Sequence, residues 1–306
     1  MTLSELFDKW HEERCKTVSE ITSKVYRSYL DKYIPDSLKN CPVNDIDPDD
    51  WTGLKQAMLD GNAPNGIHVP RSTARAALGI FHSVFIYGKR QFGLNNPANG
   101  AQIDYKNMRS VTVFTKSEIK KMRKAIKPYD ISNLCIMLCL YTGVELNEIC
   151  AVRWKNIDTE NKLLMIRGVV DRINKRGKMI KDNLTVVTPK NKKTIRDLPI
   201  PTWIAEQLEV MKPMHDDDEF LLAGEDGTVL PMTFRGQYTT FLKNAGVQKK
   251  GIIALRHTFA MTCVNKNVEV GTLSEMLGHS RVSETIRQYY VIQIKDKREI
   301  VEGLYD

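Results

Sequence analysis

The sequence of 306 residues has no run of apolar residues long enough to cross a membrane. A spanning helix needs about 20 consecutive, mostly apolar residues, and no window of this chain approaches that composition. The first 15 residues carry charges throughout and have no apolar core of the kind found in signal peptides, so we do not expect secretion. Internal repeats and low-complexity tracts are also missing, whereas apolar residues make up 42% of the chain, enough to build a folded core.

Cysteine is scarce: the chain has six, and no two of them form a C-x-x-C pair. A chain of this length does not depend on disulfides, so we interpret the cysteines as reduced and expect a cytoplasmic protein. Cys135 and Cys139 share a helix face, but their apolar surroundings predict core residues rather than metal ligands. His11 and Cys15 have the same spacing, which without a second pair of ligands is a weak zinc signal. We therefore expect no metal site.

Positive charge is in excess and is concentrated in one segment. The chain has 45 Lys and Arg residues against 37 Asp and Glu, a net charge of +8. Residues 172–196 alone hold nine basic residues and one acidic residue, which is also +8. A charge run is often only a solvated face, but here Asn174 and Gly177 supply turn residues between strand-like stretches. We therefore predict a basic hairpin suited to contact a phosphate backbone.

The hydrophobic periodicity predicts two domains. Residues 1–105 contain four amphipathic segments with helical spacing, so we predict a helical domain there. The predicted helices begin at Thr2 or Ser4, at Thr22, at Asp47-Pro48 and at Ser72, and the last ends at Asn95-Asn96-Pro97. Residues 106–113 lack helical periodicity and are predicted to form a linker.

The second predicted domain, residues 114–306, combines helices with strands. A capping-box pattern from Thr115 to Glu118 opens its first helix. Helices are predicted over 117–127, 131–141 and 145–152, strands over 162–170, 183–189 and 194–200, and mostly helix from 201 onward. The predicted fold class is therefore mainly α with a small antiparallel β-sheet, an α+β arrangement.

Four segments of the second domain carry candidate chemistry: residues 141–158, 188–201, 254–264 and 277–291. Each alone has an ordinary explanation, such as a helix end, a solvated lysine or tyrosine packing. In this order and spacing they resemble the tyrosine recombinase (phage integrase) family, and the resemblance covers nearly the whole chain. The N-terminal helices, ending in Asn96-Pro97-Ala98, look like that family's core-binding domain, and the part from Phe114 looks like its catalytic domain. The layout is similar to the compact two-domain members without an arm-binding domain.

The resemblance implies a site-specific DNA recombinase or integrase of a mobile element, nucleoid-associated and of prokaryotic or phage origin. In that chemistry a tyrosine oxygen attacks a phosphorus of double-stranded DNA and leaves a 3′-phosphotyrosyl link and a 5′-hydroxyl, so no cofactor is needed. Cationic donors must stabilise the phosphate, and a general acid must protonate the leaving 5′-oxygen. The family also implies a tetrameric synapse on DNA, formed through the tail from about residue 292, and accessory DNA-bending proteins.

The resemblance assigns roles residue by residue. Tyr289, ten residues after His279, matches the nucleophile, and its neighbour Tyr290 points in another direction on a helix. Arg256 matches the second catalytic arginine, and His279 matches a donor to the phosphate. The remaining matches are Lys190 as the general acid, His257 as the residue that follows the second arginine, and Glu148 and Arg196 as supporting residues.

Two positions depart from the family pattern. The first box, T-G-x-R-x-x-E in the family, has Glu145 in place of its arginine, and the second box, H-x-x-R, has Ile253 in place of its histidine. Removing one transition-state donor typically costs about 3–4 kcal/mol, and an ionised Glu145 opposes the phosphate charge. Protonation, turning away, or pairing with Arg153 or Lys192 are ways to relieve this. The alternative prediction is a catalytically impaired homologue that binds DNA as a regulator or architectural partner.

Basic residues outside these segments are candidate DNA contacts, with ordinary solvent exposure as an equally good explanation for each. Lys24 and Arg27 lie on the second predicted helix and Arg71 and Arg75 on the fourth, segments that in the family lie against major grooves. The candidates in the basic hairpin are Arg172, Lys175, Arg176 and Lys178. A basic helical protein that binds RNA is a third interpretation.

Overall fold

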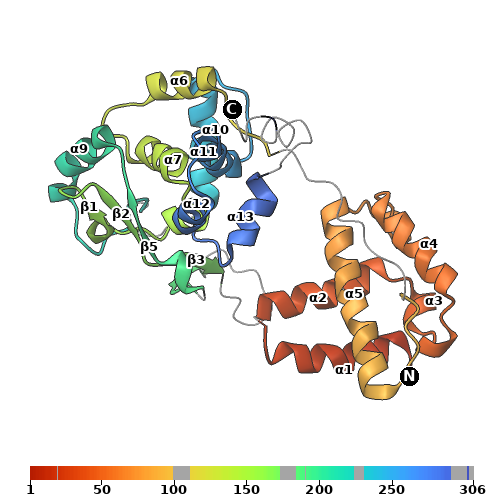
Figure 1. Cartoon of the computed structure of the whole chain (residues 1–306). Helices are drawn as coiled ribbons and strands as arrows, with labels where there is room; N and C mark the ends of the chain where they lie inside the picture. Colours follow the sequence, from red (N-terminus) through yellow and green to blue (C-terminus); the bar gives the residue numbers. More distant parts are fainter. Residues whose placement is uncertain are drawn as a thin grey trace. The chain divides into compact units, whose positions relative to one another are not determined.

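The computed structural model describes residues 1–18, 20–98, 111–172, 184–189, 191–223, 231–290 and 302. Within these ranges no helix is both long enough and apolar enough to cross a membrane. The chain divides into two compact units, Met1–Asn107 and Met108–Asp306, which are described in turn (Figure 1). Both are mainly helical, and the described strands form small antiparallel sheets in the second unit, so the predicted fold class is confirmed.

The first unit is a group of helices around an aromatic core. Its elements are α1 (Leu3–Cys15), α2 (Glu20–Tyr33), α3 (Asp36–Lys39), α4 (Pro48–Leu59) and α5 (Arg71–Phe92), with 3₁₀ turns at Val43–Asp45 and Pro64–Gly66. Trp51 of α4 packs edge-on against Phe85 of α5, with ring centroids 4.8 Å apart. Phe7 of α1 contacts Phe81 of α5 at 6.0 Å. All four rings are buried, and each buried aromatic of this kind contributes roughly 1.5–3 kcal/mol.

The helix ends of this unit follow the predicted capping chemistry only in part. Thr2 and Asp47 cap α1 and α4 as predicted, since a side-chain oxygen of each accepts a backbone N–H of the first turn. The prediction for Thr22 is wrong: it lies inside α2, which starts at Glu20, where an acidic side chain favours the helix dipole. The fourth predicted helix, α5, starts one residue early and ends at Phe92, before the predicted end, because the next residue, Gly93, has a φ of 66°.

The second unit contains the remaining elements. They are α6 (Lys116–Ala125), α7 (Ile131–Thr142), α8 (Leu146–Ile149), β1 (Ile157–Asp158), β2 (Leu163–Ile166), β3 (Val169–Arg172), β4 (Leu184–Val187), β5 (Arg196–Pro199), α9 (Thr202–Met211), α10 (Pro231–Asn244), α11 (Ile253–Asn265), α12 (Val270–Leu277) and α13 (Val282–Tyr289), with 3₁₀ turns at Trp154–Asn156, Lys192–Thr194 and Lys212–Met214.

The described part of this unit contains two small antiparallel sheets, one in the order β1-β2-β5 and one made of β3 and β4. The predicted strand over 162–170 is therefore two strands, which separate at Gly168. A Cβ at this glycine would lie 2.7 Å from a methyl carbon of Val186, so the chain approaches β4 closely only without a side chain. The pairing of β3 with β4 gives the two strands of the predicted basic hairpin.

The predicted helix over 145–152 is too long. The observed α8 ends at Ile149, because the chain then turns so that the carbonyl of Val152 accepts the N–H of Leu221 at 2.9 Å. This tertiary pairing stops the helix, and no local sequence signal announces it.

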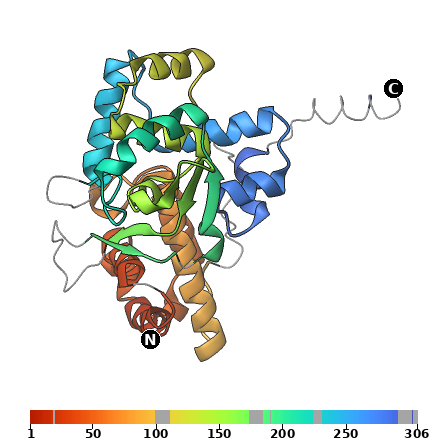
Figure 2. The same cartoon turned by 90° about the vertical axis from the view of Figure 1, so that its left-hand side faces the viewer.

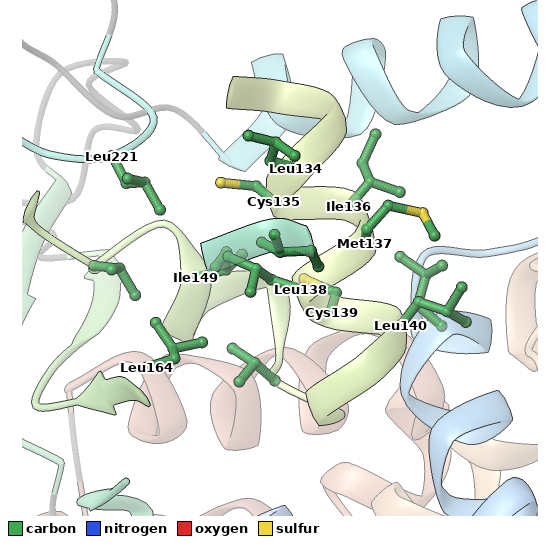
Figure 3. Packing of buried hydrophobic residues seen from close by; sticks show 14 of the residues in the cluster. Leu134, Cys135, Ile136, Met137, Leu138, Cys139, Leu140, Ile149, Leu164 and Leu221 are labelled. Atoms are coloured by element: carbon green, nitrogen blue, oxygen red, sulfur yellow. The ribbon is translucent and has the colours of Figure 1, made fainter. Parts of the chain in front are cut away.

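The core of the second unit is built around α7, which is apolar on every side (Figure 3). Its residues from Leu134 to Leu140 are all buried, as expected of a helix surrounded by other elements. Cys135 and Cys139 are among them, and burial raises the pKa of both thiols, so the prediction that they are core residues is confirmed.

Candidate active site

The last three helices and the end of α7 bring several of the motif segments together. Helix α11 packs against α7, α12 contacts α11, and α13 contacts both α11 and α12 (Figures 1 and 2). Helix α12 also contacts β5. The site described below is formed where these elements meet.

Arg256 is the buried cation at the centre of this site, with 5% of its surface exposed. Its Nη1 donates to the carbonyl of Gly143 at 2.8 Å, and its Nη2 donates to the carbonyl of Leu277 at 2.9 Å. Gly143 has a φ of 71°, and a Cβ there would lie 2.5 Å from the ring of Phe259. The turn after α7 thus needs glycine, and in return its carbonyl fixes the plane of the guanidinium.

The two positions that depart from the family pattern are placed differently: Glu145 contacts Arg256 from the start of α8, and Ile253 precedes Arg256 on α11. Glu145 is the residue before α8, and its Oε1 lies 3.3 Å from Nη2 of Arg256, with 52% of the side chain exposed. Of the partners considered from the sequence, Arg153 instead donates to the carbonyl of Asp218. Ile253 is the first residue of α11 and is 50% exposed.

Glu148 and Arg196 form a buried, bidentate ion pair. Arg196 Nη1 donates to Oε1 of Glu148 at 2.8 Å and Nη2 donates to Oε2 at 2.9 Å, while the two side chains are only 4% and 5% exposed. Arg196 Nε also donates to the carbonyl of Met276 at 2.7 Å. The pair joins α8 and β5, and its third bond reaches α12 at the residue before Leu277, whose carbonyl Arg256 contacts.

Tyr289 and Tyr290 have different surroundings. The Tyr289 side chain is buried, and its hydroxyl is hydrogen-bonded to Nδ1 of His257 at 2.9 Å. The hydroxyl of Tyr290 donates to the carbonyl of Val268 at 2.8 Å. Burial raises the pKa of the Tyr289 phenol; the charge of Arg256 and a hydrogen bond from it act in the opposite direction. Tyr289 is therefore the tyrosine that shares the site with Arg256.

Both histidines of the site are shifted toward the neutral form. Burial, followed by the charge of Arg256, lowers the pKa of His279 to about 4. The same two causes lower the pKa of His257. Nδ1 of His279 is hydrogen-bonded to Oγ1 of the buried Thr285 at 2.7 Å, which fixes the orientation of the ring.

Lys190 lies outside the described residues, but its neighbour is placed. Nδ2 of Asn191 donates to the carbonyl of Gly278 at 3.2 Å, one residue before His279. Gly278 has a φ of 71°, and a Cβ there would lie 2.8 Å from Nη1 of Arg196. The segment after β4 is thus tied to the turn that carries His279.

The sequence profile of the Phage integrase family matches residues 112–295, more than half of the chain. The chain belongs to the phage integrase family. A second profile, for the Phage integrase N-terminal SAM-like domain, matches residues 2–58. The resemblance stated from the sequence motifs is therefore confirmed.

Curated relatives of this phage integrase family member carry tyrosine recombinase names. It is 27% identical over 239 residues to the tyrosine recombinase XerC-like protein of Caldanaerobacter subterraneus subsp. tengcongensis, a match to 69% of this chain and 60% of that protein. It is 26% identical over 203 residues to the tyrosine recombinase XerA of Thermococcus onnurineus, a match to 63% of this chain and 64% of that protein. The chain thus spans less than two thirds of these relatives' own length.

Solved structures of the family share the fold. The Tn1549 transposon integrase (amino acids 82–397), in complex with circular intermediate DNA, has a TM-score of 0.75 and 19% identity, covering 99% of this chain and 100% of that one. A lambda integrase (75–356) dimer bound to a COC′ core site has a TM-score of 0.63 and 17% identity, covering 96% and 100%. At such identities the likeness is evidence for the fold alone.

The candidate DNA contacts of this integrase family member differ in exposure, in ion pairing and in whether the structure describes them. On α2, Lys24 pairs with Glu20 at 2.6 Å and Arg27 pairs with Asp8 at 2.6 Å, with all four side chains partly exposed. On α5, Arg71 is exposed in the first turn and Arg75 is half-buried. The backbone of Arg172 ends β3, whereas Lys175, Arg176 and Lys178 lie outside the described residues, as does the tail from 292 except for residue 302.

Sequence reasoning missed two residues that support this site. Thr285 orients His279 from α13, and Asn191 anchors the segment next to Lys190. Both are small polar residues whose presence has an ordinary local explanation: Thr285 lies within a helix, and Asn191 lies in a turn. Their function depends on partners 6 and 87 residues away, which a single sequence does not indicate.

Proposed function

We propose that this protein is a site-specific DNA recombinase of a mobile element, which cuts and rejoins double-stranded DNA through a 3′-phosphotyrosyl intermediate. One observation carries the proposal: the buried Tyr289 hydroxyl lies in the same site as the fixed guanidinium of Arg256, with two neutral histidines beside them. This site combines a nucleophile with donors for a phosphate, and membership of the integrase family supplies the reaction class.

In this proposal Tyr289 Oη attacks the scissile phosphorus while Arg256 stabilises the charge on the non-bridging oxygens. His279 acts as a neutral donor. If Thr285 donates to its Nδ1, the ring proton lies on Nε2 and can be directed at a phosphate oxygen. Lys190, by the family pattern, protonates the leaving 5′-oxygen. The buried pair of Glu148 and Arg196 keeps the supporting shell rigid.

The partners of this reaction are also proposals, because the match covers less than two thirds of the length of the relatives described above. The structural neighbours are DNA complexes, and together with the basic hairpin this supports double-stranded DNA as the substrate. We propose that protomers associate on DNA through the tail from residue 292, with accessory DNA-bending proteins where the site requires them, and that the protein acts at the nucleoid in the cytoplasm.

The second candidate function is a catalytically impaired homologue that binds DNA without cutting it. The observation that favours it is the Glu145 carboxylate, which lies 3.3 Å from the guanidinium that the phosphate needs. Against it, half of the Glu145 side chain is exposed, so solvent screens the carboxylate and the pair is weaker than one with both partners buried. A DNA phosphate held by many other contacts can displace such a carboxylate, so we favour the active enzyme.

The test is a nicked suicide duplex that covers the junctions of the genomic element encoding the chain, incubated with the full-length protein. The proposed function predicts a covalent protein–DNA adduct that Tyr289→Phe abolishes and Tyr290→Phe retains. No adduct with the wild type, but an adduct with the double variant Glu145→Arg, Ile253→His, supports the impaired homologue. Absence of salt-dependent DNA binding contradicts both functions and favours an RNA ligand.

A further inference from the structure

The contact between His257 and Tyr289 carries an inference about proton transfer. Nδ1 of His257 lies 2.9 Å from the Tyr289 hydroxyl, and the two rings meet edge-on with centroids 5.8 Å apart. The residues come from different helices, α11 and α13, and both belong to the second unit. A distance of 2.9 Å is within the range at which a side chain can remove a proton directly.

The two groups have complementary protonation states near pH 7. The phenol of Tyr289 keeps its proton, because burial raises its pKa above the ordinary value of 10.0. The imidazole of His257 is unprotonated, because burial and the neighbouring Arg256 lower its pKa below 6.5. A neutral phenol is a poor nucleophile and needs a base, and a neutral imidazole can serve as one.

His257 lies on α11 close to position 253, where the family pattern has a histidine. The family pattern leads us to expect a histidine at position 253, where this chain has an isoleucine that cannot exchange protons. Position 257 is one helical turn further along and on the same helix face. Side chains on a helix point back toward its N-terminus. The His257 side chain is therefore directed toward the turn that begins at position 253.

We propose that His257 is the catalytic base of this recombinase, taking the proton of Tyr289 in place of the histidine expected at position 253. The inference rests on the proposed function and deepens it. As Oη bonds to phosphorus, its proton moves to Nδ1 of His257. The bond from phosphorus to the 5′-oxygen breaks, and that oxygen receives a proton from the general acid. During rejoining the 5′-hydroxyl attacks the phosphorus and returns its proton to the group that served as the general acid. The bond from phosphorus to Oη of Tyr289 breaks, and that oxygen takes the proton back from His257.

A merely structural histidine would hold the Tyr289 ring in place without exchanging a proton. Chemical rescue distinguishes the structural role from the role of a base, because a small base in solution can replace a proton acceptor but not a packing contact. The two roles also separate by His257→Asn, since an asparagine amide can keep a hydrogen bond near the Nδ1 position but is not a base.

The experiment measures the rate of covalent adduct formation on the suicide duplex near pH 7, for the wild type, His257→Ala and His257→Asn. Loss of a positioned acid or base typically lowers rates by about 10²–10⁴-fold, so we expect at least a 10²-fold loss in both variants. Imidazole added to His257→Ala is expected to restore the rate at least 10-fold in a saturable manner, without accelerating the wild type. Salt-dependent DNA binding by each variant verifies that it is folded.

Adding Ile253→His to His257→Ala provides a second, internal test, and recovery of the rate without imidazole supports the proposal. A wild-type rate in His257→Ala, or a wild-type rate in His257→Asn, overturns the base role and leaves the proposed recombinase intact. If instead the wild type forms no adduct, or the adduct persists in Tyr289→Phe, the recombinase function itself fails, and the base role with it.

Discussion

The carboxylate of Glu145 lies 3.3 Å from the guanidinium of Arg256, the group that we propose binds a DNA phosphate. Arg256 is buried and already donates to two backbone carbonyls, so in the proposed reaction a phosphate oxygen would have to share the Nη2 side of the fork with Glu145. The proposed function therefore makes the carboxylate a competitor of the phosphate.

Replacing Glu145 is expected to increase activity rather than reduce it. Glu145→Gln removes the competing charge, and since about half of the Glu145 side chain is exposed to screening solvent we expect an adduct rate about 2- to 5-fold higher. Glu145→Arg adds a donor as well, and a gain of up to about 10²-fold is expected if the new side chain reaches the phosphate. The measurement is the adduct rate on the suicide duplex, with Glu206→Gln, an exposed acid on α9, as the matched control. A lower rate in Glu145→Gln contradicts the competitor role.

The buried pair of Glu148 and Arg196 is expected to dominate the stability of this part of the second unit. Both side chains are almost fully buried, so Glu148→Gln leaves a buried guanidinium without its counter-charge, at a cost of about 3–5 kcal/mol. Urea unfolding of the second unit measures this loss.

The matched control is the exposed pair of Arg167 and Asp197, 2.5 Å apart. Because its side chains are 41% and 49% exposed, Asp197→Asn should cost about 1 kcal/mol or less. Equal losses in Glu148→Gln and Asp197→Asn are incompatible with a supporting role for the buried pair.

Much of the fold follows from local patterns, and the exceptions have tertiary causes. The caps Thr2 and Asp47 and the buried run of α7 are local features, so the sequence predicts them. The end of α8 depends on pairing between Val152 and Leu221, and the break before β3 depends on the approach of Val186 to Gly168. Such contacts join positions distant in the chain, where propensity carries no information.

The candidate site shows the same division. Motif spacing selected Tyr289, Arg256 and His279, and the structure places all three in one unit around connected helices. Spacing did not indicate that Glu145 pairs with Arg256, or that His257 reaches the hydroxyl of Tyr289. Both contacts depend on tertiary packing: the first joins the start of α8 to α11, and the second joins α11 to α13.

The turn at Gly278 should tolerate no side chain. Its φ is 71°, and a Cβ would lie 2.8 Å from Nη1 of Arg196, so Gly278→Ala imposes strain and displaces one end of the buried ion pair. We expect a destabilisation of about 1–3 kcal/mol and a lower adduct rate, since the next residue is His279. Gly236→Ala is the control: it lies in α10 with nothing within 4 Å, and is expected to stabilise by up to about 1 kcal/mol. Urea unfolding compares the two, and similar signs would contradict the argument.

Stability of the second unit should decrease as the pH falls from 7 toward 4. His279 has a pKa of about 4 in the folded chain, against about 6.5 when unfolded, so between these values the unfolded state binds a proton that the folded state does not. The free energy of unfolding therefore decreases as the pH is lowered through this window. The lowered pKa of His257 also makes the folded state less stable at lower pH. Hydrogen exchange of the α11 and α12 amides, measured at several pH values, reports this slope.

His279→Gln isolates the contribution of this histidine, because glutamine remains neutral throughout. The variant is expected to show a smaller loss of protection between pH 7 and 5 than the wild type, in α11 and α12. Exchange in α5, which belongs to the first unit, provides the internal control and should not differ between the two proteins. An unchanged slope in α12 would mean that His279 gains its proton as readily in the folded chain as in the unfolded one, and the neutral donor proposed for the phosphate would be lost.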